Sequence, residues 1–287
     1  MAQRKVSLIR RSKLPSRYKA GNILYPSARI MGAYQREYDA LLTEVWKEAR
    51  ETILRQAEIL IEERGRTAMD AIGDDLPPSL LPGLSVITAR LQGRFREIAE
   101  RMSKVMLEDV NKSATSNVKR SLAEISESIS INYNQSDAVA SAIQDRINAN
   151  VNLITRIPEK FLGELSNDVH KAVTKGRGLA DIQVKMAERY GTQSSWYKNV
   201  AMDQVNKAYT AINTERMKEA GVTRAEWIHR PIAREPRHHH EISAAAGGLN
   251  GLVFDIDNPP IIEPRTGQRG LPGDLPFCHC IMRPVIE

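Results

Sequence analysis

The stretch "SSWYKNVAMDQVNKAYTAINTERMKEAGVTRAEWIHR" (194–230) contains the point at which the chain changes from helix to strand. Apolar residues recur along it at three- and four-residue steps, as between Val205 and Ile212, which is typical of a helix with one buried face. Gly221 is a natural C-terminal cap. The alternating "RAEWIHR" (224–230) that follows predicts a strand. We therefore expect a helical region up to Gly221 and a different kind of structure after it.

Upstream of this stretch, the same helical spacing is found in several more segments. The aromatic share is only 5%, which favours helices packed through Leu, Ile, Val and Ala. Ser136 and Asp137 are candidate N-cap residues for one of these helices. We expect helices over 33–65, 91–110, 136–154, 157–176 and 179–191, a separate helix over 194–221, and a proline-rich break at 73–84.

Downstream, the chain contains two further strand candidates. These are "GLVFDID" (251–257) and "CIMRPVI" (280–286), and Pro284 would place the second of them at a sheet edge. A loop rich in Pro and Gly, "GLPGDLP" (270–276), separates them. The predicted fold class is mainly α, with a long-helix N-terminal body and a small α+β C-terminal module. The predicted domains are an extended basic arm (1–32), a helical body (33–221) and the α+β module (222–287).

Positive charge is concentrated at the N-terminus. Nine of the 41 Lys and Arg residues precede the first acidic residue, Glu37, and leave 32 basic residues against 35 acidic ones in the chain. A basic arm on a near-neutral body indicates a polyanionic partner, most commonly nucleic acid bound through its phosphates. The alternatives are a solvated tail and an arm that docks on an acidic protein. The residues that we predict to contact DNA are Arg4, Lys5, Arg10, Arg11, Lys13, Arg17 and Lys19.

Several function classes find no support in the sequence. No apolar run approaches the ~20 residues that a membrane-spanning helix needs, and the N-terminus lacks the apolar core of a signal peptide. The only cysteines, Cys278 and Cys280, are too close in sequence to form an unstrained disulfide with each other. The chain also contains no GxxxxGK[ST], no GxGxxG at a strand–helix turn and no HExxH.

Two short stretches concentrate the residues that could carry chemistry. "REPRHHH" (234–240) holds three of the six histidines, and "CHC" (278–280) holds both cysteines. Zinc prefers Cys and His ligands, so His240, Cys278 and Cys280 are a candidate zinc site, although C-x-C is not a standard spacing. The favoured alternative is that the cysteines are small buried hydrophobes and the histidine a core hydrogen-bonder. Catalysis by His240 or by a Cys–His pair is the third interpretation.

The order of these motifs resembles a known family. Trp227, "REPR" with His240 three residues beyond it, "GLVF", "LPGD", and "CHC" with a trailing "RPVI" together resemble the Mu F-like minor head proteins of tailed phages, also called phage head morphogenesis proteins. The resemblance covers about residues 150–287. Two departures are His279, where the family usually has Arg, and a longer stretch between His240 and the following glycines. The signature residues are Trp227, Arg234, Arg237, His240, Gly273, Cys278 and Cys280.

The resemblance implies a virion component at the portal vertex or in the capsid interior, present in the host cytoplasm during assembly. Such a protein would assist head assembly, DNA packaging or DNA ejection without enzymatic turnover. Its implied partners are the portal protein, double-stranded DNA, and major capsid or scaffold proteins, with no membrane. The alternative function is a nuclease-like or other effector enzyme in the C-terminal module that is delivered with the genome. No cofactor is required by this prediction, and zinc is retained as the candidate ion.

Overall fold

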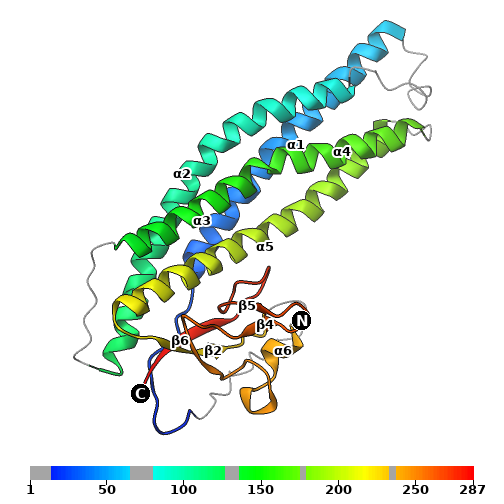
Figure 1. The fold of residues 1–287 in the computed structure, drawn as a ribbon. Helices are drawn as coiled ribbons and strands as arrows, with labels where there is room; N and C mark the ends of the chain where they lie inside the picture. The colour runs from blue at the N-terminus through cyan, green and yellow to red at the C-terminus, as the bar shows by residue number, and fades with distance from the viewer. Residues whose placement is uncertain (1–13, 65–79, 127–135, 175–178, 233–236) are drawn as a thin grey trace, which may run out of the picture. The chain divides into compact units, whose positions relative to one another are not determined.

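The computed structural model describes residues 14–64, 80–126, 136–174, 179–232 and 237–287 (Figure 1). Long helices dominate these residues, and the small strands gather toward the C-terminus, which confirms the predicted fold class. The long helices are α1 (Ala28–Arg64), α2 (Leu80–Ala123), α3 (Asp137–Thr155), α4 (Ile157–Thr174) and α5 (Leu179–Glu219). The shorter elements are β1 (Lys19–Ala20), β2 (Arg224–Ile228), α6 (His238–Glu241), the 3₁₀ helix η3 (Ala244–Ala246), β3 (Val253–Asp255), β4 (Ile261–Glu263), β5 (Gln268–Arg269) and β6 (Ile281–Ile286).

The chain forms two compact units from interleaved segments. One, which we call the helical unit, contains residues 31–106 and 146–202. The other, the sheet unit, contains residues 1–30, 107–145 and 203–287, of which 1–13, 127–135 and 233–236 lie outside the described residues. Neither unit coincides with one of the predicted ranges 1–32, 33–221 and 222–287, because α2, α3 and α5 each contribute to both units.

The helical unit has the apolar core that the periodicity predicted. Along α1, Leu42, Val45 and Ala49 are fully buried, at the three- and four-residue steps that place side chains on one helix face. Aromatic residues contribute to this core: the rings of Tyr34 and Tyr38 meet edge to face with centroids 5.2 Å apart. The Tyr34 hydroxyl donates a hydrogen bond to Asn150 Oδ1 at 3.1 Å, which satisfies a buried polar group.

Helix α5 differs from the sequence prediction of two helices over 179–191 and 194–221. It is continuous from Leu179 to Glu219, and Gly191 lies inside it. A glycine inside a helix costs about 1 kcal/mol relative to alanine, and the packing of the flanking residues offsets this cost: Met186 and Tyr197 are both buried. The predicted cap at Gly221 is confirmed, since Gly221 has φ +75° and the Val222 N–H reaches the Met217 carbonyl at 2.9 Å, as in a Schellman motif.

Helix starts also follow local chemistry. The Ser136 hydroxyl accepts a hydrogen bond from the Val139 N–H at 3.2 Å, which confirms its predicted role as the N-cap of α3. Helix α1 begins at Ala28, within the range predicted as an extended arm. Pro82 lies in the first turn of α2, where a missing N–H leaves no helical hydrogen bond unmade. None of the helices that the structure describes combines the length and apolar character needed to cross a membrane.

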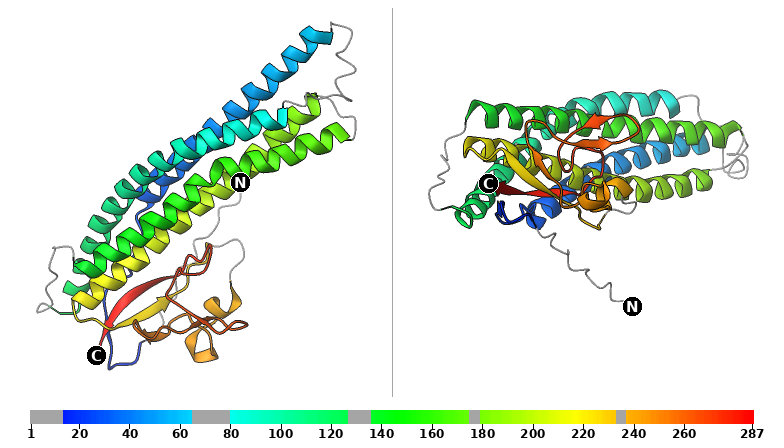
Figure 2. Two further views of the ribbon diagram at one scale, coloured as in Figure 1. Left: turned by 45° about the horizontal axis from the view of Figure 1, so that its top comes forward. Right: turned by 60° about the horizontal axis from the view of Figure 1, so that its bottom comes forward.

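The sheet unit is built on an antiparallel sheet with the strand order β1-β6-β2-β3. The chain thus adds a strand from near its N-terminus to its last strand, and Figure 2 shows the blue N-terminal segment beside the red β6. Lys19 faces Ile286 and Ala20 faces Val285. The pairing continues past β1, because the Leu24 N–H donates to the Met282 carbonyl at 3.0 Å.

The prediction that Pro284 marks an edge strand is wrong, because β6 lies between β1 and β2. The N–H and C=O of one residue in an antiparallel strand point toward the same neighbour. The Pro284 carbonyl accepts a hydrogen bond from the Gly21 N–H at 2.9 Å, so the missing N–H faces the β1 side. Strand β1 is only two residues long, and Pro284 stands opposite Ala225 on the β2 side. The proline therefore removes no hydrogen bond between β6 and β2.

The core of the sheet unit joins the sheet to the ends of two long helices. Val118 and Leu122 of α2 and Met217 of α5 pack with Trp227 and Met282 in one buried cluster. A buried ion pair crosses the sheet: Arg283, opposite Glu226 in the register, places its guanidinium 2.5 Å from the Glu226 carboxylate. The Glu226 side chain is 0% exposed.

Candidate metal centre

His240 lies in the short helix α6 and is held in one orientation. Its Nε2 atom is 2.9 Å from the carbonyl oxygen of Ile262, on β4. A carbonyl can only accept, so Nε2 carries a proton, and the neutral ring in this tautomer would present its lone pair at Nδ1. The ring also meets the Trp227 ring edge to face, with centroids 5.1 Å apart. The imidazole is thus fixed in the tautomer and orientation that a metal-binding histidine needs.

The two cysteines follow a pair of tandem turns. The turns "LPGD" (271–274) and "LPFC" (275–278) each close with a hydrogen bond from the fourth N–H to the first carbonyl, at 3.1 and 3.0 Å. Each has proline second and a positive φ third, +94° at Gly273 and +57° at Phe277, the features of a type II turn. Phe277 is the one non-glycine residue with positive φ in the described part of the chain. The strained conformation of Phe277 positions the next residue, Cys278, in the site.

A polar stripe on α5 anchors these turns. Its members, Asp203, Asn206 and Thr210, are spaced by three and four residues and are all buried. Asp203 Oδ1 accepts from the Phe277 N–H at 2.8 Å, Asn206 Nδ2 donates to the Cys278 carbonyl at 3.1 Å, and the Thr210 hydroxyl donates to the Pro272 carbonyl at 2.8 Å. Together these bonds satisfy backbone groups that the loop could not pair within itself.

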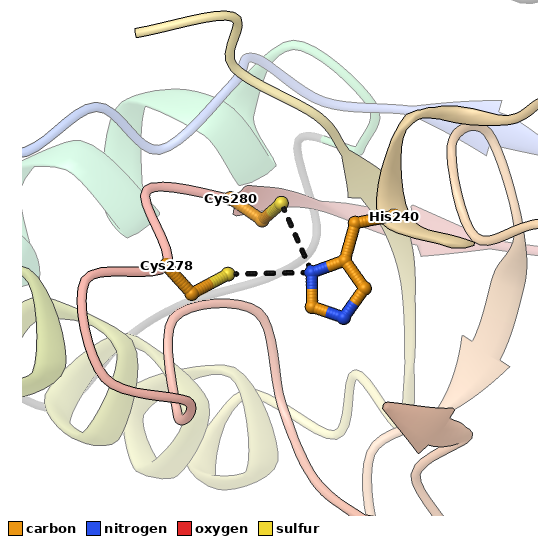
Figure 3. Close-up of side chains that lie close together, drawn as sticks. All are labelled: His240, Cys278 and Cys280. Atoms are coloured by element: carbon orange, nitrogen blue, oxygen red, sulfur yellow. Dashed lines mark hydrogen bonds between the residues drawn. The ribbon is translucent and has the colours of Figure 1, made fainter. Parts of the chain in front are cut away.

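The three candidate ligands converge on one point, as Figure 3 shows. His240 Nδ1 lies 3.5 Å from Cys278 Sγ and 3.8 Å from Cys280 Sγ, and the three ligand atoms lie within 4.8 Å of one another. Zn–S bonds of about 2.3 Å and Zn–N bonds of about 2.0 Å at a tetrahedral angle separate nitrogen from sulfur by roughly 3.5 Å. The spacing of the three atoms therefore fits a single tetrahedral ion.

The electrostatics of the cluster favour a cation. The Cys280 thiol, against the effect of burial and with help from His240, lowers the pKa of the Cys278 thiol to about 4. The same contact with Cys278, reinforced by burial, raises the pKa of Cys280. The pair therefore holds one thiolate and one thiol at neutral pH, which places a negative charge in a buried site. Thiolate is the form of cysteine that binds metals, and a bound cation would displace the remaining proton.

The sequence predicted the cluster correctly but missed its supports. Nothing local in "AMDQVNKAYT" (201–210) indicates that its polar residues face the core, and the only signal is their three- and four-residue spacing. His229 was also missed: its Nδ1 lies 3.7 Å from Cys280 Sγ. It directly follows β2, whose alternation would have placed it on the Trp227 face.

The remaining predicted residues divide between the site and the surface. Trp227 is fully buried, and Gly273 lies in the first turn. Arg237 is partly buried and donates a hydrogen bond to the Pro276 carbonyl at 3.1 Å, which supports the second turn. Arg234 lies outside the described residues, as do Arg4, Lys5, Arg10, Arg11 and Lys13. Of the predicted DNA-contacting residues, Arg17 and Lys19 are described, and both are exposed.

Comparison of the chain with protein-family models, with curated proteins and with solved structures gives no match. The resemblance to Mu F-like proteins therefore depends on the motifs quoted above. What the geometry defines by itself is a buried His–Cys–Cys cluster suited to a metal ion, with its ligands on a short helix and on the turn-rich loop that precedes β6.

Proposed function

We propose that this chain is a minor head protein of a tailed phage, in which the C-terminal module is a folded anchor and the basic N-terminal arm binds double-stranded DNA. The observation that carries the proposal is the convergence of the resemblance residues. Trp227, His240 and the Cys278–Cys280 pair belong to three separate motifs, yet all four residues are buried in direct or adjacent contact. An ordered set of motifs that meets around one cluster is more specific than any of its members.

We propose zinc as the ion of the cluster, with a structural role. The fit is supported by donor chemistry: two sulfurs and one imidazole nitrogen are the ligands that zinc prefers, and their spacing suits a tetrahedron. Cys278, Cys280 and His240 would hold the ion. It would cross-link the turn-rich loop to α6, and α6 in turn contacts β4 through His240. A module of about 65 residues gains stability from such a link, since small cores supply little by themselves.

The N-terminal arm supplies the second part of the proposal. Lys19 is paired to β6, and residues 1–13, which hold five of the predicted DNA-contacting residues, precede it in the chain. Phosphate contacts by Lys and Arg provide affinity without reading sequence, which suits a protein that handles a whole genome during packaging or ejection. The proposed partners are the portal protein, double-stranded DNA, and capsid or scaffold proteins. The proposed location is the capsid interior or portal vertex, after assembly in the host cytoplasm.

The absence of enzymatic turnover is also part of the proposal. His240 is 2% exposed, and its Nε2–H is committed to a backbone carbonyl while its Nδ1 faces two sulfurs. A general acid or base must reach the substrate within hydrogen-bond distance, which a ring in this position does poorly. A nuclease-like effector remains the alternative function, and nuclease activity that His240→Ala abolishes in the purified protein would overturn our choice.

The experiment that tests the proposal is protein identification in purified virions of the phage whose genome encodes the chain. We expect the chain in mature particles at low copy number, and we expect it to remain with the portal protein when capsids are disrupted. Its absence from both mature virions and assembly intermediates would contradict the proposal. As a control for specificity, Cys278→Ser/Cys280→Ser phage should yield heads that lack the chain or contain less of it.

A further inference from the structure

Three protein ligands would leave one position of a tetrahedral zinc ion unfilled, and His229 lies beside one of the three, with its Nδ1 atom 3.7 Å from Cys280 Sγ. The register of β2 and β6 pairs Trp227 with Met282 and Ile228 with Ile281. Continued by one residue, the same register sets His229 opposite Cys280. Directly opposite residues in antiparallel strands have Cβ atoms about 5 Å apart and project their side chains from the same face. His229 therefore shares its face with Trp227, the residue that contacts His240.

The contacts of His229 agree with this placement. Its Nδ1 atom lies 3.7 Å from Cys280 Sγ, close to the roughly 3.5 Å expected between nitrogen and sulfur ligands of one zinc ion. Its backbone N–H is held by Asn250 Oδ1 at 3.1 Å, which fixes the residue at the end of β2.

One nitrogen of the His229 ring lacks a hydrogen-bond partner, which is unusual for a buried structural histidine. The residue is 8% exposed, and its Nε2 atom makes no hydrogen bond among the residues that the structure describes. A buried polar atom without a partner costs about 1–3 kcal/mol. By contrast, the Nε2 of His240 is fully engaged.

We propose that His229 is the fourth ligand of the metal centre, which makes it a closed Cys₂His₂ zinc site. This inference rests on the proposed zinc site and deepens it. Four protein ligands leave no position for water, and such closed sites are structural, whereas catalytic zinc sites keep one position open. The ion would then join β2, α6 and the loop that precedes β6, and so tie the end of the central strand pair to the helix and the turns.

The deciding measurement is X-ray absorption at the zinc edge of the full-length wild-type protein loaded with one zinc per chain. Multiple scattering from imidazole rings counts the histidine ligands. We expect two sulfurs and two imidazoles. Two sulfurs with one imidazole and one oxygen ligand would overturn the assignment of His229 while leaving the zinc proposal intact. A wild-type protein that binds no zinc would overturn the zinc proposal itself.

Cobalt substitution of variants provides the second test. His229→Cys should convert the site to Cys₃His and raise the sulfur-to-cobalt charge-transfer intensity by about half, since three thiolates replace two. His229→Ala should weaken zinc binding by at least about tenfold. The matched control is His238→Ala, which removes an exposed histidine near the site. It should leave the charge-transfer intensity and the zinc affinity unchanged. A His229→Cys spectrum identical to that of the wild type would contradict the proposal.

Discussion

The amide of Asn206 donates a hydrogen bond to the backbone carbonyl of Cys278 at 3.1 Å, across 72 residues of sequence. A long helix thus fixes the backbone of a metal-ligand candidate directly. The bond is buried, so Asn206 Nδ2 and the Cys278 carbonyl would each lose a partner if the other were removed, and neither could turn to water without a rearrangement of the loop.

Replacement of Asn206 should therefore destabilise the sheet unit. We expect Asn206→Ala to lower the free energy of unfolding by about 1–3 kcal/mol, because a buried carbonyl loses its donor. Urea denaturation followed by circular dichroism measures this. Asn199→Ala, at an exposed position of the same helix, is the control and should change stability by less than about 0.5 kcal/mol. Equal effects of the two substitutions would show that the hydrogen bond from Asn206 to the Cys278 carbonyl does not stabilise the protein.

The turn at Gly273 permits a comparison of two glycines. Gly273 has φ +94°, and a Cβ there would stand 2.7 Å from Asn206 Nδ2. Gly267 has φ +71°, and a Cβ there would meet nothing within 4 Å. We expect Gly267→Ala to cost about 1–2 kcal/mol from backbone strain alone. Gly273→Ala should cost at least about 1 kcal/mol more, because it adds a clash. Thermal melts of both variants show which substitution destabilises the protein more. A smaller loss of stability for Gly273→Ala than for Gly267→Ala would contradict the prediction.

The buried pair of Glu226 and Arg283 should show strong coupling. Arg283→Met leaves a carboxylate in a fully buried position without its guanidinium, and we expect a loss of about 3–5 kcal/mol. The double variant Glu226→Gln/Arg283→Met removes both charges and should be more stable than the single Arg283→Met variant. Guanidinium denaturation of the wild type, the two single variants and the double variant gives the coupling energy. Additive effects would contradict a direct interaction.

Removal of metal should lower the thermal stability of the sheet unit. We expect the purified wild type to contain close to one zinc per chain and Cys278→Ser/Cys280→Ser to contain none. A strong chelator should lower the melting temperature of the wild type to that of the variant, because metal that binds only the folded state stabilises it. Elemental analysis and calorimetry measure the two effects. Zinc retained by the double variant would place the ion elsewhere, for example on the exposed histidines.

The basic arm should control DNA binding through charge alone. Deletion of residues 1–13 removes five predicted phosphate contacts and spares β1, so the fold should be preserved. We expect weaker binding to duplex DNA and a salt dependence shallower by about 4–5 in the log–log slope. A full-length variant with Gln at Arg4, Lys5, Arg10, Arg11 and Lys13 should behave like the deletion, since both lack the charges. Unchanged DNA binding at low salt in either protein would show that the arm does not contribute to DNA binding.

Local patterns predicted the elements well because they depend on neighbours in sequence. The apolar spacing of Leu42, Val45 and Ala49 predicts a buried helix face, and Ser136 and Gly221 predict where helices start and stop. Local patterns failed at Gly191, where they predicted the end of a helix. A single glycine disfavours a helix only weakly, and the buried residues on both sides of it keep α5 continuous. Local patterns also failed for Pro284, because the position of a strand in a sheet depends on which distant segment pairs with it.

The sequence alone determined which residues could form helices, strands and turns, and that His240, Cys278 and Cys280 were the candidate metal ligands. Only the tertiary structure decided that an N-terminal strand would close the sheet beside β6, that α5 would hold the cysteine loop through Asn206, and that His229 would stand opposite Cys280. The reason is physical: propensity and capping act over one or two turns of chain, whereas register, burial and ligand geometry arise from contacts between segments far apart in sequence.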